Sequence, residues 1–311
     1  MIAPLHPNSV TTMAAVIAVL IVATVVTWIL GRVRPGTKLE EIRKRVRSWW
    51  VIVGIFFVAL ALNRTASLVF FGLVSFLALK EYLSLIPTRR ADRRVLLLAY
   101  LSIPVQYIWV GIDWYGMFII FIPVYMLLVL PARMVLIGET EGFLRSAGTL
   151  HWGLMMTVFS VSHVAFLLAL PESVNPFGGA AQVLFLVLLT EFNDVAQFLW
   201  GKSLGRRRVV PTVSPNKTWG GLLGGVGTTV ALGTALAPWL TPFSRAEAMG
   251  AAALIGISGF VGDVVISAVK RDLGIKDSGN MLPGHGGILD RIDSLTYTAP
   301  LFFHYARYLH G

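Results

Sequence analysis

Residues 11–30 read TTMAAVIAVLIVATVVTWIL, a continuous stretch without a charged side chain. A helix needs about 20 apolar residues to cross the hydrocarbon core of a bilayer. The ten residues before it lack the basic segment and the small-residue cleavage site of a signal peptide. We therefore expect this stretch to be kept as a first membrane span.

The rest of the chain has the same apolar character. Of its 311 residues, 56% are hydrophobic and 14% are charged, whereas a soluble domain has about 25% charged residues. Further spans are predicted at 48–62, 65–86, 95–112, 115–132, 149–170, 178–200, 217–240 and 247–269, with a weaker tenth near 295–309. The sequence thus predicts an all-α polytopic membrane protein with about nine transmembrane helices. The absence of cysteine excludes disulfides and thiolate chemistry.

The net charge of +10 comes mainly from basic clusters that lie between the spans. The clusters are Arg32 to Arg47, Arg89 to Arg94, Arg206 to Arg208 and Lys270 to Lys276. Nine spans with an outside N-terminus place all four on the cytoplasmic side, in agreement with the positive-inside rule. We expect membrane lipids, and no nucleic acid, as their partners. The expected location is a bacterial inner (plasma) membrane, with the active site facing the cytoplasm.

Two regions follow from this organisation: an N-terminal transmembrane region, 1–132, and a C-terminal transmembrane catalytic region, 133–311. The second contains a cytoplasmic loop at 267–293 that is rich in polar residues. Segment 37–49 is mostly charged, with apolar residues at helical spacing on one face. It is interpreted either as a basic interfacial helix leading into the second span or as a solvated linker.

The first group of candidate site residues lies at the cytoplasmic end of the ninth span. Asp263, Ser267 and Lys270 follow each other at i, i+4 and i+7, so they share one face of a helix. A carboxylate inside a span is costly unless it is paired or bound to a cation. The alternative to a functional site is a structural Asp263–Lys270 pair.

The loop that follows holds more of these residue types. Its glycines and proline, around His285, predict a tight turn whose backbone can approach a ligand closely. Asp290 and Asp293 are one helical turn apart, so both can point at one ion. Together with Asp263 they offer hard oxygen ligands suited to Mg²⁺. Zinc is not expected, because the chain has no cysteine and His285 has no histidine nearby.

Two further groups contain candidate residues. Ser214-Pro215 fits the start of a helix, where N–H groups and the nearby Lys217 favour an anion. Asn193-Asp194 lies near the end of the seventh span, with Gln197 and Glu191 one turn away; it is either functional or a polar anchor between helices. Lys80-Glu81 is interpreted as a structural pair, and His163 as a hydrogen-bonded core histidine.

One motif joins these residues over a long stretch. It is Ser267-x-Val269-Lys270-Arg271, then Lys276-Asp277, then His285-Gly286-Gly287-Ile288-x-Asp290-Arg291-Ile292-Asp293. This motif resembles the signature of the phosphatidate cytidylyltransferases, also called CDP-diacylglycerol synthases. Segments 78–82, 194–201 and 214–218 are similar to further segments of that family. The resemblance is close over the C-terminal third and loose over the N-terminal half.

The resemblance implies an all-helical polytopic fold, usually a homodimer, that uses CTP and Mg²⁺ on the cytoplasmic side. The reaction it implies transfers CMP from CTP to phosphatidate, giving CDP-diacylglycerol and pyrophosphate. The implied metal ligands are Asp263, Asp290 and Asp293. The residues expected to act on the substrates are Asp194, Lys217, Lys270, Arg271, His285 and Arg291. Those expected to bind the nucleotide are Ser214, Asn216, Lys217, Ser267, Lys276, Asp277, Gly286 and Gly287. Asp194 and Asn216 are expected to orient a substrate or a second cation.

The sequence departs from the family pattern at three places. Gly220 and Ile266 stand where the family commonly has glutamate, and Gln197 stands within a segment that usually reads Asp-Thr-Gly-Ala-Tyr. These departures indicate a variant branch and leave the acceptor lipid open.

Other hypotheses remain at this point. The chain could act on a different lipid phosphate or be a CTP-dependent lipid kinase. It could be a transporter with Asp194, Asp263 and His163 along a polar path, or a membrane scaffold without catalytic activity.

Overall fold

The computed structural model describes residues 5–33, 37–89, 92–170, 175–279 and 286–311, and these are almost entirely helical. The helices are α1 Pro7–Val33, α2 Thr37–Leu62, α3 Arg64–Leu85, α4 Arg93–Gly111, α5 Tyr115–Ile120, α6 Leu127–Val135, α7 Phe143–Leu154, α8 Ser160–Leu167, α9 Gly179–Leu204, α10 Trp219–Leu240, α11 Arg245–Asp272, α12 Leu289–Ile292 and α13 Leu295–His310. Two π-helical turns, η2 Phe121–Met126 and η3 Met155–Phe159, join α5 to α6 and α7 to α8. Within the described residues, nine helical segments are long and apolar enough to cross a membrane, so the predicted fold class is confirmed.

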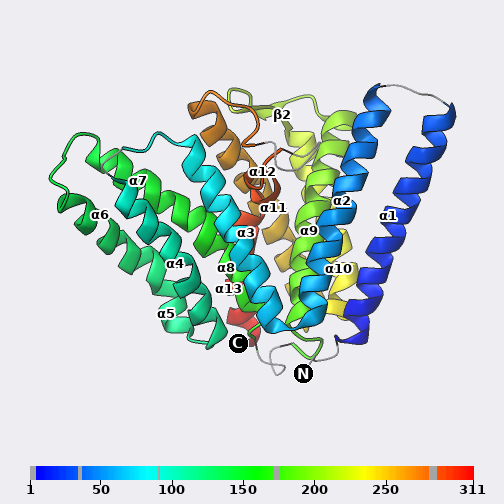
Figure 1. Ribbon diagram of the computed structural model, residues 1–311. Helices are drawn as coiled ribbons and strands as arrows, with labels where there is room; N and C mark the ends of the chain where they lie inside the picture. The colour runs from blue at the N-terminus through cyan, green and yellow to red at the C-terminus, as the bar shows by residue number, and fades with distance from the viewer. Residues whose placement is uncertain (1–4, 34–36, 90–91, 171–174, 280–285) are drawn as a thin grey trace.

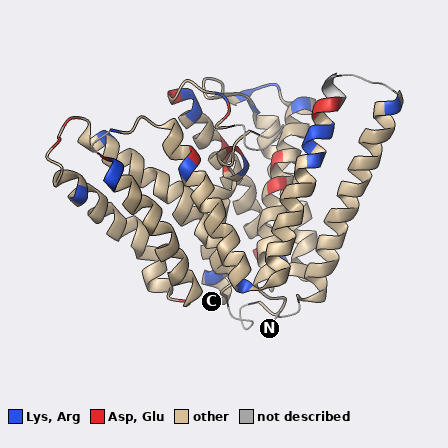
Figure 2. Ribbon diagram, viewed as in Figure 1, with Lys and Arg blue, Asp and Glu red and all other residues tan. Residues whose placement is uncertain are grey.

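The helices form one bundle (Figure 1). Helices α3, α8, α9, α11 and α13 occupy its middle, α1 and α2 lie at one side, and α4 to α7 lie at the other (Figure 1). Most Lys and Arg residues gather at the end of the bundle where α2 begins and α11 ends (Figure 2). Because charged side chains are costly in a bilayer core, this distribution places that end at a membrane surface.

The second span differs from the sequence prediction. Helix α2 continues without interruption from Thr37 to Leu62, so segment 37–49 is helical and leads into the second span, and the alternative of a linker is wrong. Charged residues at helical spacing extend the apolar helix by about three turns because nothing in between breaks it. Glu41 and Arg45, one turn apart, form an exposed ion pair of 2.8 Å on this extension.

The weaker tenth helix is present as α13. It packs against α8 and α11, and the Tyr305 hydroxyl near its end donates to the Glu247 carbonyl at the start of α11, at 2.9 Å. Its 16 residues, Leu295–His310, are short for a span. The helix lies in the middle of the bundle (Figure 1), and one of its faces, with Phe302 and Phe303, is fully buried.

A short hairpin precedes α10 and corrects a second local prediction. Strands β1 Arg208–Val210 and β2 Ser214–Thr218 pair antiparallel, so Ser214-Pro215 is part of a strand and does not open a helix. The N-cap of α10 is Thr218, whose hydroxyl accepts a hydrogen bond from the Gly221 N–H at 3.1 Å. The hairpin thereby holds Lys217 one residue before this N-cap, within reach of Gln197 on α9 and Asp263 on α11.

Polar residues inside the bundle connect its helices. The fully buried Asn193 on α9 donates to the Gly256 carbonyl on α11 and accepts from Thr229 on α10, both at 3.1 Å. This makes Asn193 the anchor between helices that the sequence left as an alternative. His163 is fully buried, with Nδ1 2.8 Å from the Phe159 carbonyl, which confirms its interpretation as a core histidine.

Close packing of α10 on α11 leads to a first prediction. A Cβ at Gly233 would lie 2.6 Å from the Ala252 Cβ, whereas a Cβ at Gly227, on the same helix, meets nothing within 4 Å. Gly233→Ala should lower the thermal unfolding midpoint in detergent, because overpacking costs about 1–3 kcal/mol. Gly227→Ala is the control and should keep or raise the midpoint. Equal midpoints for the two variants would show that the helices are not packed this closely.

Candidate active site

Helix α11 carries the first carboxylate of the site. Asp263 and Ser267 share a face as predicted, and the Ser267 hydroxyl donates to Asp263 Oδ1 at 3.2 Å. Asp263 Oδ2 lies 2.5 Å from the ammonium of Lys217, which comes from the hairpin. The alternative Asp263–Lys270 pair is wrong, because Lys270 binds a different carboxylate.

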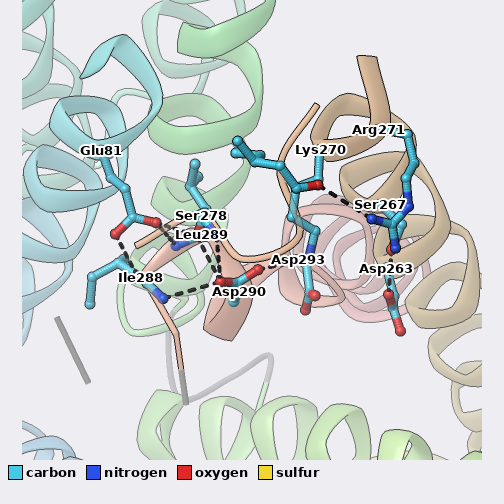
Figure 3. Close-up of polar contacts among 12 residues, drawn as sticks. Glu81, Asp263, Ser267, Lys270, Arg271, Ser278, Ile288, Leu289, Asp290 and Asp293 are labelled. Carbon is cyan, nitrogen blue, oxygen red and sulfur yellow. Dashed lines mark hydrogen bonds and ion pairs between the residues drawn. The ribbon is translucent and has the colours of Figure 1, made fainter. Parts of the chain in front are cut away.

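That carboxylate is Asp290 on the one-turn helix α12. Its Oδ1 lies 2.7 Å from Lys270 Nζ, in an ion pair whose side chains are only 15% and 8% exposed. Its Oδ2 accepts from the backbone N–H and the hydroxyl of Ser278, both at 2.9 Å, and from the Gly287 N–H at 3.1 Å. Burial raises the pKa of Asp290, but these donors and the charge of Lys270 outweigh it and hold the pKa below its usual value. Both Asp290 oxygens are therefore already occupied by protein donors (Figure 3).

Glu81 on α3 joins the same loop, and its predicted pairing with Lys80 is wrong. Its carboxylate accepts the Ser278 hydroxyl and the N–H groups of Ile288 and Leu289 (Figure 3). Lys80 is exposed and forms no ion pair with it in the described structure, because consecutive helical residues point in different directions. The contact joins residues about 200 positions apart, so no local pattern indicates it.

A second carboxylate group lies on the other side of Asp290. Asp194 Oδ2 on α9 accepts the Ser294 hydroxyl at 2.9 Å, and Asp293 Oδ1 accepts the Ser294 N–H at 2.8 Å. Burial, and then the charges of Asp263 and Asp194, raise the pKa of Asp293 well above its usual value. Asp293 is thus near enough to Asp194 and Asp263 to be affected by their charges, whereas Asp290 binds the N–H groups of its own loop (Figure 3).

A cavity of about 250 Å³ opens beside this second group. Its walls include Asp194, Asp263, Gln197 and Lys217, together with Ser214, Asn216 and Thr218 of the hairpin. Lys217 Nζ donates to Gln197 Oε1 at 3.1 Å, so both side chains are held at the wall. The structure therefore brings together five predicted site residues from three segments: Asp194 of α9, Asp263 of α11, and Ser214, Asn216 and Lys217 of β2.

The predicted magnesium ligands fit a cation to different degrees. Among the described residues, no group of three or more His, Asp or Glu side chains is placed so that it could hold a metal ion. Asp194 Oδ1, however, is buried and accepts no hydrogen bond in the described structure. A buried carboxylate oxygen without a donor is costly, and a cation beside Asp263 and Asp293 would satisfy it. Asp290 would first have to give up Lys270 or Ser278.

The other predicted residues lie around these two groups. Arg271 donates to the carbonyls of Val213 and Ile275, so it fastens the hairpin to the end of α11 and does not face the carboxylates. Lys276 and Asp277 are exposed on the loop. Arg291 on α12 is half-buried, and its Nε has no partner among the described residues. His285 lies outside the described residues.

Two glycines of the motif have a structural explanation. Gly286 has a φ of +77°, and a Cβ there would lie 2.4 Å from Asp290 Oδ2. A Cβ at Gly287 would lie 2.0 Å from Glu81 Oε1. Both positions need glycine because carboxylates of the protein itself occupy the space next to the loop.

The departures from the family pattern also have local causes. Ile266 is 4% exposed and packs inside the bundle, where an unpaired carboxylate would be costly. A Cβ at Gly220 would lie 2.8 Å from the Leu204 carbonyl, so a side chain there requires α9 and α10 to move apart. Both residues suit close helix packing at the edge of the site.

A larger cavity, of about 800 Å³, lies on the opposite face of α11. Ala268, Val269 and Asp272 of that helix line it, with Tyr82 of α3 and Trp152 of α7. No carboxylate of the two groups described above lines it.

Comparison with known proteins adds to this geometry. The sequence profile described as "Cytidylyltransferase family" matches residues 43–309, which is most of the chain and includes every residue of the site. Only α1 and the start of α2 precede the match.

The chain is also similar to individual proteins. The chain is 50% identical to "Uncharacterized protein YnbB" of Escherichia coli K12 over 296 residues, which are 95% of this chain and 97% of that protein. It is 38% identical to a phosphatidate cytidylyltransferase of Brucella suis over 146 residues, 47% of this chain and 54% of that enzyme. A phosphatidate cytidylyltransferase of Synechocystis is 46% identical over 114 residues, 36% of this chain and 38% of that enzyme. The matches to the two named enzymes thus cover about half of each chain or less.

The Lys270–Asp290 pair leads to a second prediction. Lys270→Met leaves Asp290 buried without its cation, and removing one partner of a buried pair costs about 3–5 kcal/mol. Hydrogen–deuterium exchange at Ser278 and Gly287, whose N–H groups bind Asp290, should therefore become faster. Lys202→Met, at an exposed lysine, should leave this exchange unchanged. Equal exchange in the two variants would contradict the role of the pair.

Proposed function

Since this chain belongs to the cytidylyltransferase family, we propose that it transfers a cytidylyl group from CTP to phosphatidate. The observation that carries the proposal is the pair of Asp263 and Lys217 beside Asp194, at the wall of a cavity at the charged end of the bundle. An integral membrane enzyme with its site at that end can reach a nucleotide from water and a lipid phosphate from the bilayer.

The proposed reaction is a displacement at phosphorus. A phosphate oxygen of phosphatidate attacks the α-phosphorus of CTP, and the bond from that phosphorus to the bridging α–β oxygen breaks. CDP-diacylglycerol forms, and pyrophosphate leaves with the electron pair of that bond. The attacking phosphate is already an anion near neutral pH, so the reaction requires positioning and charge neutralisation more than a strong base.

The basic residues suit this requirement. Lys217 lies at the cavity wall, and Lys270 of α11 is paired with Asp290 of α12. Both lysines are only partly exposed. We assign them, with Arg291, to offsetting the charge of the two anionic substrates and of pyrophosphate. Ser214 and Asn216 line the same cavity and are assigned to the nucleotide. Arg206 to Arg208, exposed before and at the start of β1, would raise the local concentration of CTP at low salt.

Magnesium is the proposed cofactor. When bound, it would neutralise nucleotide phosphate charge and favour attack at phosphorus. Asp263 and Asp293 would hold it, with Asp194 near enough to contribute or to orient a second cation. Only Asp263 is paired with Lys217, and Asp194 Oδ1 has no donor among the described residues, so a divalent cation would relieve the repulsion between these carboxylates that helps to raise the pKa of Asp293.

We further propose a homodimer in a bacterial inner membrane, with the charged end in the cytoplasm. A different lipid phosphate as acceptor, or phosphorylation of a lipid by CTP, are the competing reactions. Ile266 and Gly220 replace two glutamates of the family pattern at the edge of the site, so the family pattern alone does not fix the identity of the acceptor lipid.

The reaction predicts where label from CTP appears. Purified protein with Mg²⁺ and phosphatidate should move label from the α-phosphate of CTP into the lipid, and label from the γ-phosphate into pyrophosphate. Chromatography of both fractions measures this. Label from the γ-phosphate in the lipid would establish a kinase instead. A panel containing lysophosphatidate and polyprenyl phosphate would identify another acceptor if phosphatidate is inert.

The cation site makes a separate prediction. Asp263→Asn keeps the shape of the side chain but removes its charge, so activity should fall by about a hundredfold or more and require more Mg²⁺. Asp272→Asn changes an exposed carboxylate on the same helix and should match the wild type. A Mg²⁺ titration of the reaction rate measures both. Wild-type Mg²⁺ dependence in Asp263→Asn would remove Asp263 from the cation site.

A further inference from the structure

Glu81 is part of the transmembrane helix α3, yet its carboxylate binds residues of the segment between α11 and the first turn of α12. Its three donors are the Ser278 hydroxyl and the N–H groups of Ile288, at 2.8 Å, and Leu289, at 3.1 Å. The side chain is 8% exposed, so water does not replace these donors. A buried carboxylate with three donors is a strong local constraint, because each charge-assisted hydrogen bond is stronger than a neutral one.

The position of Asp290 depends on the same contact. Ser278 lies between the two carboxylates, and its hydroxyl is within hydrogen-bond distance of both Glu81 and Asp290 Oδ2. Its N–H also binds Asp290 Oδ2. Ile288 and Leu289 immediately precede Asp290, so fixing their N–H groups fixes where α12 begins.

The loop is also shaped to receive this carboxylate. A Cβ at Gly287 would lie 2.0 Å from Glu81 Oε1, and one at Gly279 would lie 3.0 Å from Glu81 Oε2. Glycine at both positions leaves space that Glu81 fills. The contact is therefore matched from both sides of the loop.

We propose that Glu81 is a positioning residue for catalysis: by binding Ser278, Ile288 and Leu289 it sets the placement of α12, and thereby of Asp290, Arg291 and Asp293. The inference rests on the proposed function, since the placed residues belong to that site. It assigns to α3, in the N-terminal region, a direct part in shaping the active site.

Substitutions at Glu81 separate this role from general stability. Glu81→Gln keeps the volume and one acceptor oxygen but turns an NH₂ group toward a backbone N–H; Glu81→Ala removes all three contacts. We expect kcat to fall about tenfold in Glu81→Gln and about a hundredfold in Glu81→Ala. Lys80→Ala, at the exposed neighbour, is the control and should retain the wild-type kcat. The variants should keep the wild-type elution profile and helical content, because the contact lies at the end of the bundle.

A double-mutant cycle tests whether Glu81 acts through the loop. If it does, the kcat of the Glu81→Gln/Ser278→Ala double variant should be close to that of the slower single variant, because the effects of coupled residues are not additive. Multiplicative losses, or a wild-type kcat in Glu81→Gln, would overturn the proposal.

Amide exchange at Ile288 and Leu289 gives a readout that needs no activity. Exchange there should become faster in Glu81→Gln and Glu81→Ala but not in Lys80→Ala. The two possible failures can be told apart. A wild-type protein without cytidylyl transfer would contradict the proposed function. Amide exchange in both Glu81 variants that equals the wild-type exchange would contradict the positioning role.

Discussion

Carboxylates buried at the end of an apolar helix bundle impose the main constraint on this structure. Each one loses hydration, and each needs a donor, a cation or a proton in return. The chain meets this requirement in two ways. Glu81 and Asp290 are saturated with donors from one loop and Lys270. Asp263 is paired with Lys217, and Asp194 and Asp293 accept from Ser294, but Asp194 Oδ1 has no donor among the described residues.

This difference distinguishes carboxylates that hold the loop in place from carboxylates that can bind a ligand. Saturated carboxylates hold a loop rigidly and have little capacity for a ligand. Unsaturated carboxylates are less stable alone, which is the usual state of groups that bind a cation or a substrate. The glycines of the motif belong to the first group, since Gly286 and Gly287 make room for Asp290 and Glu81. The nucleotide contacts are therefore to be sought at the hairpin side, around Ser214, Asn216 and Lys217.

The sequence predicts most of the fold because hydropathy and chain length act locally. All nine predicted spans correspond to helices, and the weak tenth is α13. Local patterns that allow two structures are less decisive: 37–49 is helical, as one of its two interpretations predicts, but Ser214-Pro215 lies in a strand and not at a helix start. The sequence predicts which residues belong to the candidate site but not which of them form ion pairs with each other. Asp263, Lys270 and Asp290 are visible as a motif, but which cation meets which carboxylate depends on how α11, α12 and the hairpin meet in space.

Glu81 shows the limit most clearly. In sequence its nearest charged neighbour is Lys80, which favours a local pair, while its actual donors lie about 200 residues away. No periodicity connects α3 to a loop that follows α11. The indirect signal is the pair of glycines at 286 and 287, which shows that something must approach the backbone closely; the sequence leaves open whether that is a phosphate or a carboxylate of the chain itself. In the structure the Glu81 carboxylate lies next to Gly287, so a phosphate bound at that glycine would have to displace Glu81.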